Sequence, residues 1–305
     1  MTQALFLEMA KKEELLKEQG GRRLNVSGVL RILGVSRSGY LRFKKRLPSD
    51  REKRKQVLKE RILSIYEESH QNYGAPKITG CLRKEGEKIA EKTVGNYMRE
   101  LGIRAQYIKP YTVTTIDSDF SSKLENILEE KFNPEEPDEV WCSDITYIWT
   151  YEGFVYLTSI MDLYSRKIIA WVLSDTLEAK WVVEAAEKAK AARDAGRPRI
   201  LHTDRGIQYI CSDYVKATEG IQRSYSKKAY PWDNACIESF HALIKREWLN
   251  RFKIKDYDHA YRLVFQYIEA FYNTVRVHSH CGYFSPDEYE KNYGKEFEGR
   301  EKMAG

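Results

Sequence analysis

Three acidic residues stand at positions from which a sheet-based metal site can be built. Asp144 lies inside a predicted strand bounded by aromatic residues, Asp204 directly follows an apolar strand, and Glu238 lies on a predicted helix. Three carboxylates from separate elements repel one another unless a cation compensates them. Hard oxygen ligands without a nearby Cys or His cluster favour Mg²⁺ or Mn²⁺. Two such ions ~4 Å apart can activate the attacking oxygen and stabilise the leaving oxygen in phosphoryl transfer.

Taken singly, each of these acids has an ordinary alternative. The chain has 45 Asp and Glu residues, and most acidic residues in a protein are solvated surface charges. The hypothesis of a metal site therefore depends on the combination of the three acids with the elements that carry them.

Those elements follow from the periodicity of residues 139–272. Strands are predicted where β-forming residues alternate or gather in short apolar runs, at 140–149, 154–162, 167–173, 199–203 and 221–225. Helices are predicted at 177–192, 212–218, 234–249 and 257–272, and an irregular basic segment follows the last of them. The order of strands and helices predicts a mixed five-stranded α/β sheet of the ribonuclease H kind.

The helix that bears Glu238 has a clear apolar face. Its members are Ile237, Phe240, Ile244 and Trp248. Asp233 is the expected N-cap. Lys245 lies seven residues, or two turns, beyond Glu238, so both side chains point the same way.

The first half of the chain predicts helical DNA-binding units. A short amphipathic helix is expected over 5–18. A second helix over 26–33 is broken by Gly34, and Ser36 is the expected N-cap of a third helix that runs to about Lys45. This pattern is typical of a helix-turn-helix, although a plain helical hairpin fits it too. The residues expected to contact DNA from the last helix are Arg37, Ser38, Tyr40, Arg42 and Lys44.

A second helical unit follows. Helices are expected at 51–69, 77–84 and 90–101, with a turn at 73–76. Lys92 and Arg99 are its candidate DNA contacts. Residues 106–139 lack periodicity and predict a linker with a short helix near 123–130.

Charge is distributed unevenly between the two halves. Residues 1–110 carry 25 Lys and Arg against 13 Asp and Glu, a net charge of +12, whereas residues 111–305 carry 26 against 32. A basic first half favours a polyanionic partner such as double-stranded DNA, because each phosphate contact releases counterions; a basic surface without a partner is the alternative.

Several other classes of protein are disfavoured. The five cysteines are scattered and form no CxxC pair, which argues against a disulfide framework or a zinc module. No apolar run approaches the ~20 residues that a membrane helix needs, and the N-terminus does not resemble a signal peptide. We therefore expect no membrane partner and a cytoplasmic location.

These observations define six predicted segments. They are an N-terminal helix (1–22), a helix-turn-helix (23–48), a second helical DNA-binding unit (49–108), a linker (109–136), a ribonuclease H-like catalytic domain (137–250) and a C-terminal helical extension (251–305).

The motifs as a set resemble those of a known family. They include Ile32 to Tyr40, Tyr73-Gly74, Trp141 to Tyr147, Met161 to Arg166, His202 to Gly206 with Gln208-Tyr209, Asp233 to Ala235 with Glu238 to Phe240, Lys245 to Glu247, Phe271 to Asn273 with Arg276, and Ser285-Pro286. On these residues the chain resembles the orfB-type transposases of the bacterial insertion sequence three family, relatives of retroviral integrases. The resemblance covers about residues 24–290.

The resemblance implies a DDE triad at Asp144, Asp204 and Glu238. It also implies Mg²⁺-dependent strand cleavage and transfer at the terminal inverted repeats of a mobile element, by a homo-oligomer on DNA. Lys245 would contact DNA near the reacting end. His202 and Arg205, which flank the second Asp, either touch the scissile phosphate or make purely structural hydrogen bonds or salt bridges. An upstream reading-frame partner protein and an association with the bacterial nucleoid are also expected of such a family.

The sequence departs from the family pattern at two places, and two other functions are alternatives. Only 33 residues separate Asp204 from Glu238, slightly fewer than is usual, and Thr203 stands where Ser is more common. The alternatives are a DNA-binding regulator on an inactivated ribonuclease H-like domain and a structure-selective nuclease. The complete triad disfavours the first, and the helical DNA-binding units disfavour the second. Asp162, also acidic and in a strand, is interpreted as structural, and a role as a metal ligand is the alternative.

Overall fold

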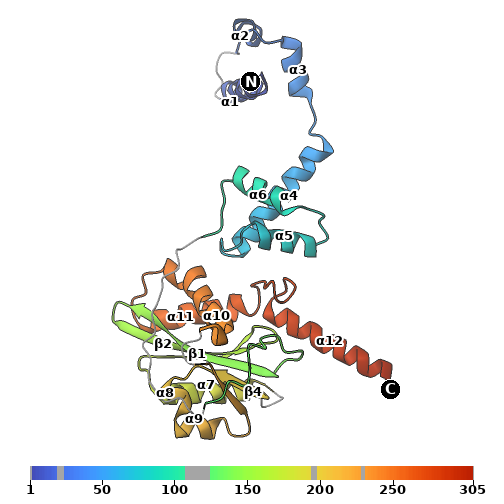
Figure 1. The fold of residues 1–305 in the computed structure, drawn as a ribbon. Helices are drawn as coiled ribbons and strands as arrows, with labels where there is room; N and C mark the ends of the chain where they lie inside the picture. Colours follow the sequence, from blue (N-terminus) through green and yellow to red (C-terminus); the bar gives the residue numbers. More distant parts are fainter. Residues whose placement is uncertain (1, 19–23, 107–123, 194–197, 228–230, 305) are drawn as a thin grey trace. The chain divides into compact units, whose positions relative to one another are not determined.

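The computed structural model describes residues 2–18, 24–106, 124–193, 198–227 and 231–304 of the chain, and Figure 1 gives its element labels. Its contacts divide the chain into two units, Met1–Arg61 and Ile62–Gly305. No helix among the described residues is long and apolar enough to cross a membrane.

The first unit contains three short helices and the start of a fourth. They are α1 (Thr2–Glu18), α2 (Val26–Ile32), α3 (Arg37–Lys45) and the first part of α4 (Asp50–Glu68). The predicted helix, glycine turn and helix are confirmed. Gly34 has a φ of 65°, which favours glycine, and the Ser36 side chain accepts a hydrogen bond from the Gly39 N–H as an N-cap. Phe6, Met9, Leu30 and Tyr40 form the buried core of this unit.

The second unit begins with three helices that pack together. The end of α4, α5 (Ala75–Lys84) and α6 (Glu91–Glu100) enclose a core that includes Ile62, Ile78, Leu82 and Val94. The sequence placed Ala75 and Pro76 in a turn before the helix, which was wrong. Pro76 lies in the first turn of α5, where its missing N–H costs no hydrogen bond.

A five-stranded sheet forms the centre of the remaining chain. Its strands are β1 (Val140–Thr150), β2 (Gly153–Asp162), β3 (Ile168–Ser174), β4 (Ile200–Thr203) and β5 (Gln222–Tyr225). The order across the sheet is β3-β2-β1-β4-β5. The first three strands form an antiparallel meander, and β4 and β5 add to β1 in parallel. The predicted mixed sheet is confirmed.

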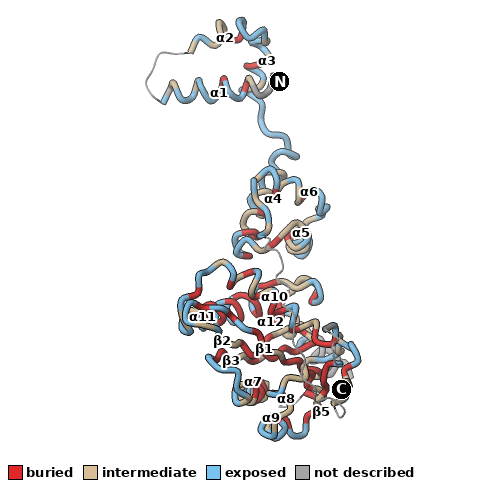
Figure 2. Tube along the Cα trace, turned by 60° about the vertical axis from the view of Figure 1, so that its left-hand side comes forward, coloured by how far each residue is buried: buried red, intermediate tan, exposed pale blue. Residues whose placement is uncertain are grey.

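Helices cover both faces of this sheet. On one face α7 (Ala179–Ala192), α8 (Ile207–Ile210) and α9 (Ser212–Ala217) pack over Trp141, Ile160 and Leu201. On the other, α10 (Ala235–Glu247) and α11 (Tyr257–Tyr267) pack over Val140, Cys142 and Leu157. Buried residues concentrate in the sheet and its covering helices (Figure 2).

Short turns link the later helices. They are a 3₁₀ turn at Pro231–Asn234, a second at Leu249–Arg251 and a π-helical turn at Ile268–Tyr272. The terminal helix α12 (Pro286–Ala304) was not predicted individually, because its sequence is mostly charged and lacks an apolar stripe.

Two local predictions were wrong. Within the described residues 124–130 there is no helix; the segment packs on the sheet instead, with Leu128 buried and the Ile127 and Leu128 N–H groups donating to the Ser224 hydroxyl. Residues 107–123, the rest of the expected linker, lie outside the described residues. Asp233 is not the N-cap of α10, because a 3₁₀ turn intervenes. Its carboxylate accepts from the Lys227 N–H and from Asn126.

Candidate active site

Two of the three acids are placed by neighbouring parallel strands. Ser143 of β1 is paired with Thr203 of β4. Asp144 is the next residue of β1, and Asp204 directly follows the last residue of β4. Adjacent parallel strands in this register bring the two carboxylates together beyond the carboxyl end of β4, which is where α/β sheets place their ligands. Alternation of side chains puts Asp144 on the same face of β1 as Val140 and Cys142, the face that α10 covers.

Glu238 reaches the same place from α10. Ile237, Phe240 and Ile244 bury one side of the helix against the sheet, as the sequence predicted. Glu238, in the first turn, is therefore held next to the strand ends. The three carboxyl groups are close enough for the charges of Asp144 and Asp204 to contribute, after burial, to raising the pKa of Glu238.

The electrostatics of Asp204 and Glu238 are unfavourable to the ionised forms of these two carboxyl groups. Burial, and then the neighbouring Asp144 carboxylate, raise the pKa of Asp204 to about 6, against a single opposing hydrogen bond from the Gly206 N–H at 2.9 Å. Burial, and then Asp144 and Asp204, raise the pKa of Glu238. A carboxylate cluster with raised pKa values is the electrostatic signature of a site that a cation completes.

A residue that the sequence analysis missed joins this cluster. His241, one turn beyond Glu238 on α10, places Nδ1 at 3.3 Å from Asp144 Oδ2 and Nε2 at 3.3 Å from the Ser159 hydroxyl. The imidazole therefore lies between Asp144 and β2. The spacing of Glu238 and His241, three residues apart on a helix, was the available signal.

Lys245 completes the polar side of α10. Its Nζ lies 4.5 Å from the centroid of the Tyr147 ring, a cation–π contact on β1 three residues beyond Asp144. Burial lowers the pKa of Lys245, and Asp144 acts in the opposite direction. An ammonium group thus stands beside the acids without neutralising the whole cluster.

The donor chemistry of the site suits a hard divalent cation. All three acids supply carboxylate oxygens, and their mutual repulsion is what a Mg²⁺ or Mn²⁺ ion would relieve. In the conformation of the described residues, however, no three His, Cys, Asp or Glu side chains are already closed around one point. The three acids lie near one another, but in this conformation their oxygens do not form a complete coordination shell for one ion.

Asp162 does not belong to this cluster. It is fully buried at the far end of β2, where its carboxylate accepts from the Asp138 and Tyr164 N–H groups at 2.8 Å each and lies 3.6 Å from Arg193. These partners support the structural interpretation made from the sequence.

The residues that flank Asp204 are engaged within the fold. His202 is buried, and its two ring nitrogens lie 2.8 and 3.1 Å from the Ser224 and Ser226 hydroxyls. Burial lowers its pKa to about 4. Arg205 donates to the Ser226 and Leu124 carbonyls. The expected phosphate contact of His202 is therefore wrong for this conformation, and the structural alternative describes both residues.

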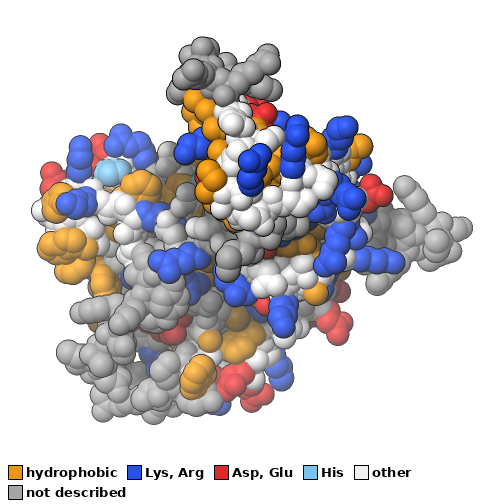
Figure 3. Space-filling model, turned by 90° about the horizontal axis from the view of Figure 1, so that it is seen from above, with side chains coloured by type: hydrophobic (Ala, Val, Ile, Leu, Met, Phe, Trp, Pro, Cys, Tyr) orange, Lys and Arg blue, Asp and Glu red, His pale blue; other side chains and the backbone are white. Residues whose placement is uncertain are grey.

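The expected DNA contacts of the helical units divide into two groups. Arg37, Ser38, Arg42, Lys92 and Arg99 are exposed. Tyr40 is 1% exposed and donates its hydroxyl to Glu13, so its side chain belongs to the core and its predicted DNA contact is wrong. Lys44 is paired with the same Glu13 at 2.9 Å. On the face drawn in Figure 3, Lys and Arg side chains are more prominent than acidic ones.

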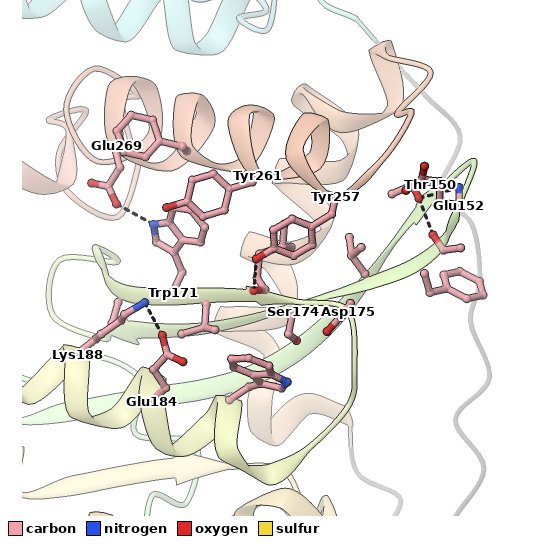
Figure 4. Close-up of a pocket in the computed structure, with 18 of the residues that line it drawn as sticks. Thr150, Glu152, Trp171, Ser174, Asp175, Glu184, Lys188, Tyr257, Tyr261 and Glu269 are labelled. Atoms are coloured by element: carbon pink, nitrogen blue, oxygen red, sulfur yellow. Dashed lines mark hydrogen bonds and ion pairs between the residues drawn. The ribbon is translucent and has the colours of Figure 1, made fainter.

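The sheet domain also has a cavity away from the acids. A cavity of about 900 Å³ follows the edge strand β3 between α7 and α11 (Figure 4). Aromatic and acidic side chains line it, including Trp171, Tyr257, Tyr261, Glu184 and Glu269. None of the three clustered acids lines it, so cavity size does not identify the chemistry of this chain.

Comparison with known families agrees with the two parts of the fold. Residues 53–111 match an HTH-like domain family, and residues 134–231 and 219–286 match two integrase core domain families. All three acids of the cluster fall within the integrase core matches.

Characterised relatives match along most of the chain. "Transposase InsF for insertion sequence IS3A" of Escherichia coli (strain K12) is 34% identical over 270 residues, 87% of this chain and 94% of the relative. "Transposase for insertion sequence element IS904" of Lactococcus lactis subsp. lactis (strain IL1403) is 35% identical over 248 residues, 81% of this chain and 98% of the relative.

Solved structures of viral integrases are more distant. The catalytic core of HTLV-2 integrase, solved as a dimeric form in complex with magnesium, is 15% identical, with a TM-score of 0.39, and covers 51% of this chain and 97% of that core. The simian T-cell lymphotropic virus intasome chain is 14% identical, with a TM-score of 0.43, and covers 75% of this chain and 74% of that one.

Proposed function

Because the chain belongs to the IS3 family of insertion-sequence transposases and contains an integrase core with a ribonuclease H-like fold, we propose that it cleaves and joins DNA at the ends of its element with Asp144, Asp204 and Glu238 as catalytic residues. It binds the terminal inverted repeats through its helical first half. Metal-dependent strand cleavage is followed by strand transfer into a target.

The convergence of three carboxylates at one end of the sheet is the observation that supports this proposal. They come from β1, from the end of β4 and from α10, and burial and like charge disfavour the ionised forms of Asp204 and Glu238. Maintaining such a cluster costs stability, and proteins accept that cost at functional sites.

Asp144, Asp204 and Glu238 would hold Mg²⁺, or Mn²⁺ in its place, as two ions. When bound, these ions supply Lewis-acid stabilisation of the attacking and leaving oxygens of phosphoryl transfer. The protein's own contribution is to position the strand and to compensate charge.

The other residues of the site act on the DNA and on the acids. Lys245 offers a cation next to Asp144, suited to a phosphate beside the reacting one. His241 holds the Asp144 carboxylate from the side of β2. Arg37, Arg42, Lys92 and Arg99 are exposed and available for phosphate or base contacts in the helical units.

The assembly on DNA is part of the same proposal. Transposition requires two element ends held together, so we infer a homo-oligomer on double-stranded DNA. An upstream reading-frame product is the second protein partner that the family resemblance leads us to expect.

A cleavage and strand-transfer assay on candidate terminal repeats tests this function. Asp144→Asn, Asp204→Asn and Glu238→Gln should each abolish product formation in Mg²⁺ and leave DNA binding largely intact, because each removes one ionic ligand without changing side-chain size. Asp213→Asn, at an exposed acid of α9, is the matched control and should retain full activity. EDTA should stop the wild-type reaction. Full activity in any of the three variants would contradict the assignment of that residue.

A further inference from the structure

Four aromatic side chains share one face of the β1–β2 hairpin. Tyr147 is paired with Tyr156, and Trp149 with Phe154, so their side chains project from the same side of the two strands. The Phe154 ring lies 4.8 Å from Trp149 and 5.4 Å from Tyr147, measured between centroids. These four residues form a continuous aromatic face.

The aromatic face is open to solvent. Tyr147 is 38% exposed, Phe154 48% and Trp149 60%. Strand β4 pairs with β1 only as far as Ser143, so beyond that residue β1 has no strand neighbour on this side among the residues that the structure describes. The opposite face of the hairpin, which carries Ile148 and Val155, is buried in the core. A row of large exposed aromatics on one side of a hairpin indicates a binding surface.

This face begins beside Asp204. A cavity of about 190 Å³ is bounded by Tyr147 and Tyr156 on one side and by Asp204 and Gln208 on the other. The Lys245 ammonium lies over the Tyr147 ring. An unpaired nucleotide that follows a phosphate held at the acids would therefore meet a cation, an amide and aromatic rings.

Lysines also lie near the outer end of the hairpin. The Tyr151 N–H donates to the Ile254 carbonyl at 3.1 Å, which fixes the hairpin tip to the segment that carries Lys253 and Lys255, both exposed. Cations at both ends of an aromatic row match a nucleic-acid strand, whose phosphates run alongside its bases. An apolar protein partner would instead have to bury the Lys245 charge.

We propose that the aromatic face of the hairpin binds the unpaired bases of a DNA strand next to the bond that reacts. This inference rests on the proposed function, because it extends the substrate of the same site from a duplex end to a locally single-stranded one. Bases stack on Tyr147, Phe154 and Trp149, and stacking tolerates any base because each base has a π-face. Gln208 faces the base nearest to Asp204.

Binding of fluorescent oligonucleotides to the full chain in EDTA tests the proposal. The probes are a blunt duplex and the same duplex with a single-stranded extension, followed by anisotropy. Trp149→Ala should weaken binding of the extended duplex by about tenfold or more, as expected for loss of one stacked base, and leave the blunt duplex unchanged. Trp149→Phe, which keeps a ring, should restore most of the affinity.

Phe265→Ala is the matched control, because Phe265 is 49% exposed on α11, outside the aromatic face. It should bind both probes as the wild type does. Unchanged affinity of Trp149→Ala for the extended duplex would overturn the proposal, and so would an equal loss for both duplexes. A fall in oligomeric mass with unchanged DNA affinity would assign the face to a second copy of the chain and overturn it as well. Because EDTA prevents cleavage, failure here is distinct from failure of the acid variants.

Discussion

The two ends of helix α10 carry carboxylates in opposite electrostatic settings. Glu238, in the first turn, faces Asp144 and Asp204, and its pKa is raised by burial and by these like charges. Glu247, in the last turn, is buried too, yet the hydrogen bonds and charge of Arg276 overcome the effect of burial and hold its pKa at about 2. Arg276 contacts it through two nitrogens at 2.7 Å, and Tyr267 donates a third hydrogen bond.

The difference indicates that Glu247 stabilises the fold, whereas Glu238 is suited to binding a ligand. Glu247 is satisfied by partners that the chain itself supplies. For Asp204 and Glu238, burial and like charge outweigh what the described partners supply, and the missing compensation is what a cation would bring. Burial acts to raise the pKa of both carboxyl groups, so the partners of each one, and not its burial, distinguish a structural role from a ligand-binding role.

Removing the charge of Glu247, the acid that Arg276 compensates, should change the free energy of unfolding more than removing the charge of Asp204. Glu247→Gln leaves the Arg276 charge buried without its partner, which typically costs about 3–5 kcal/mol. The free energy of unfolding, measured by urea denaturation, should fall by that amount. The matched control is Glu184→Gln, which breaks an exposed ion pair with Lys188 at 2.8 Å and should cost at most about 0.5 kcal/mol. Equal losses in the two variants would contradict the contrast drawn along α10.

Asp204 should make a smaller contribution to stability than Glu247, and this contribution should change with pH in the opposite direction. The folded-state pKa of Asp204, about 6, is above its ordinary 3.8, so between these values the folded protein binds more protons than the unfolded chain. Stability contributed by this group therefore falls as pH rises through that window. For Glu247, whose pKa is lowered from 4.5 to about 2, stability is instead lost as pH falls through its window.

Asp204→Asn isolates the first of these contributions. In EDTA, the unfolding free energy of the variant relative to wild type should increase by about 1–3 kcal/mol between about pH 4 and about pH 7. Urea denaturation at the two pH values measures it. A relative stability that does not change with pH, or that decreases, would show that Asp204 is not strained by its neighbours.

Much of this arrangement could be predicted from local pattern. Alternating β-formers around Asp144 and the apolar stripe Ile237, Phe240 and Ile244 on α10 are properties of short segments, and the structure confirms them. Segment-level patterns work because the side-chain period of a strand or helix is set by its own backbone.

What escaped prediction depends on partners distant in sequence. Tyr40 has the residue type of a DNA contact, but Phe6 and Glu13 of α1 draw it into a core. His202 is only two residues before Asp204 in the sequence, yet both of its ring nitrogens are hydrogen-bonded to the hydroxyls of Ser224 and Ser226. The contact of His241 with Asp144 could not be predicted, because it depends on how β1, β2 and α10 pack to place the imidazole between Asp144 and Ser159.

Calorimetric titration of the DNA-free chain with Mn²⁺ tests the central claim most directly. At a pH above the pKa of Asp204, about 6, the wild type should bind the ion, whereas Asp204→Asn and Glu238→Gln should bind it at least about tenfold more weakly, because each loses one charged oxygen ligand. Asp213→Asn should bind as the wild type does. Equal affinities of wild type, Asp204→Asn and Glu238→Gln would contradict the account of these carboxylates as an uncompensated cluster that holds the metal.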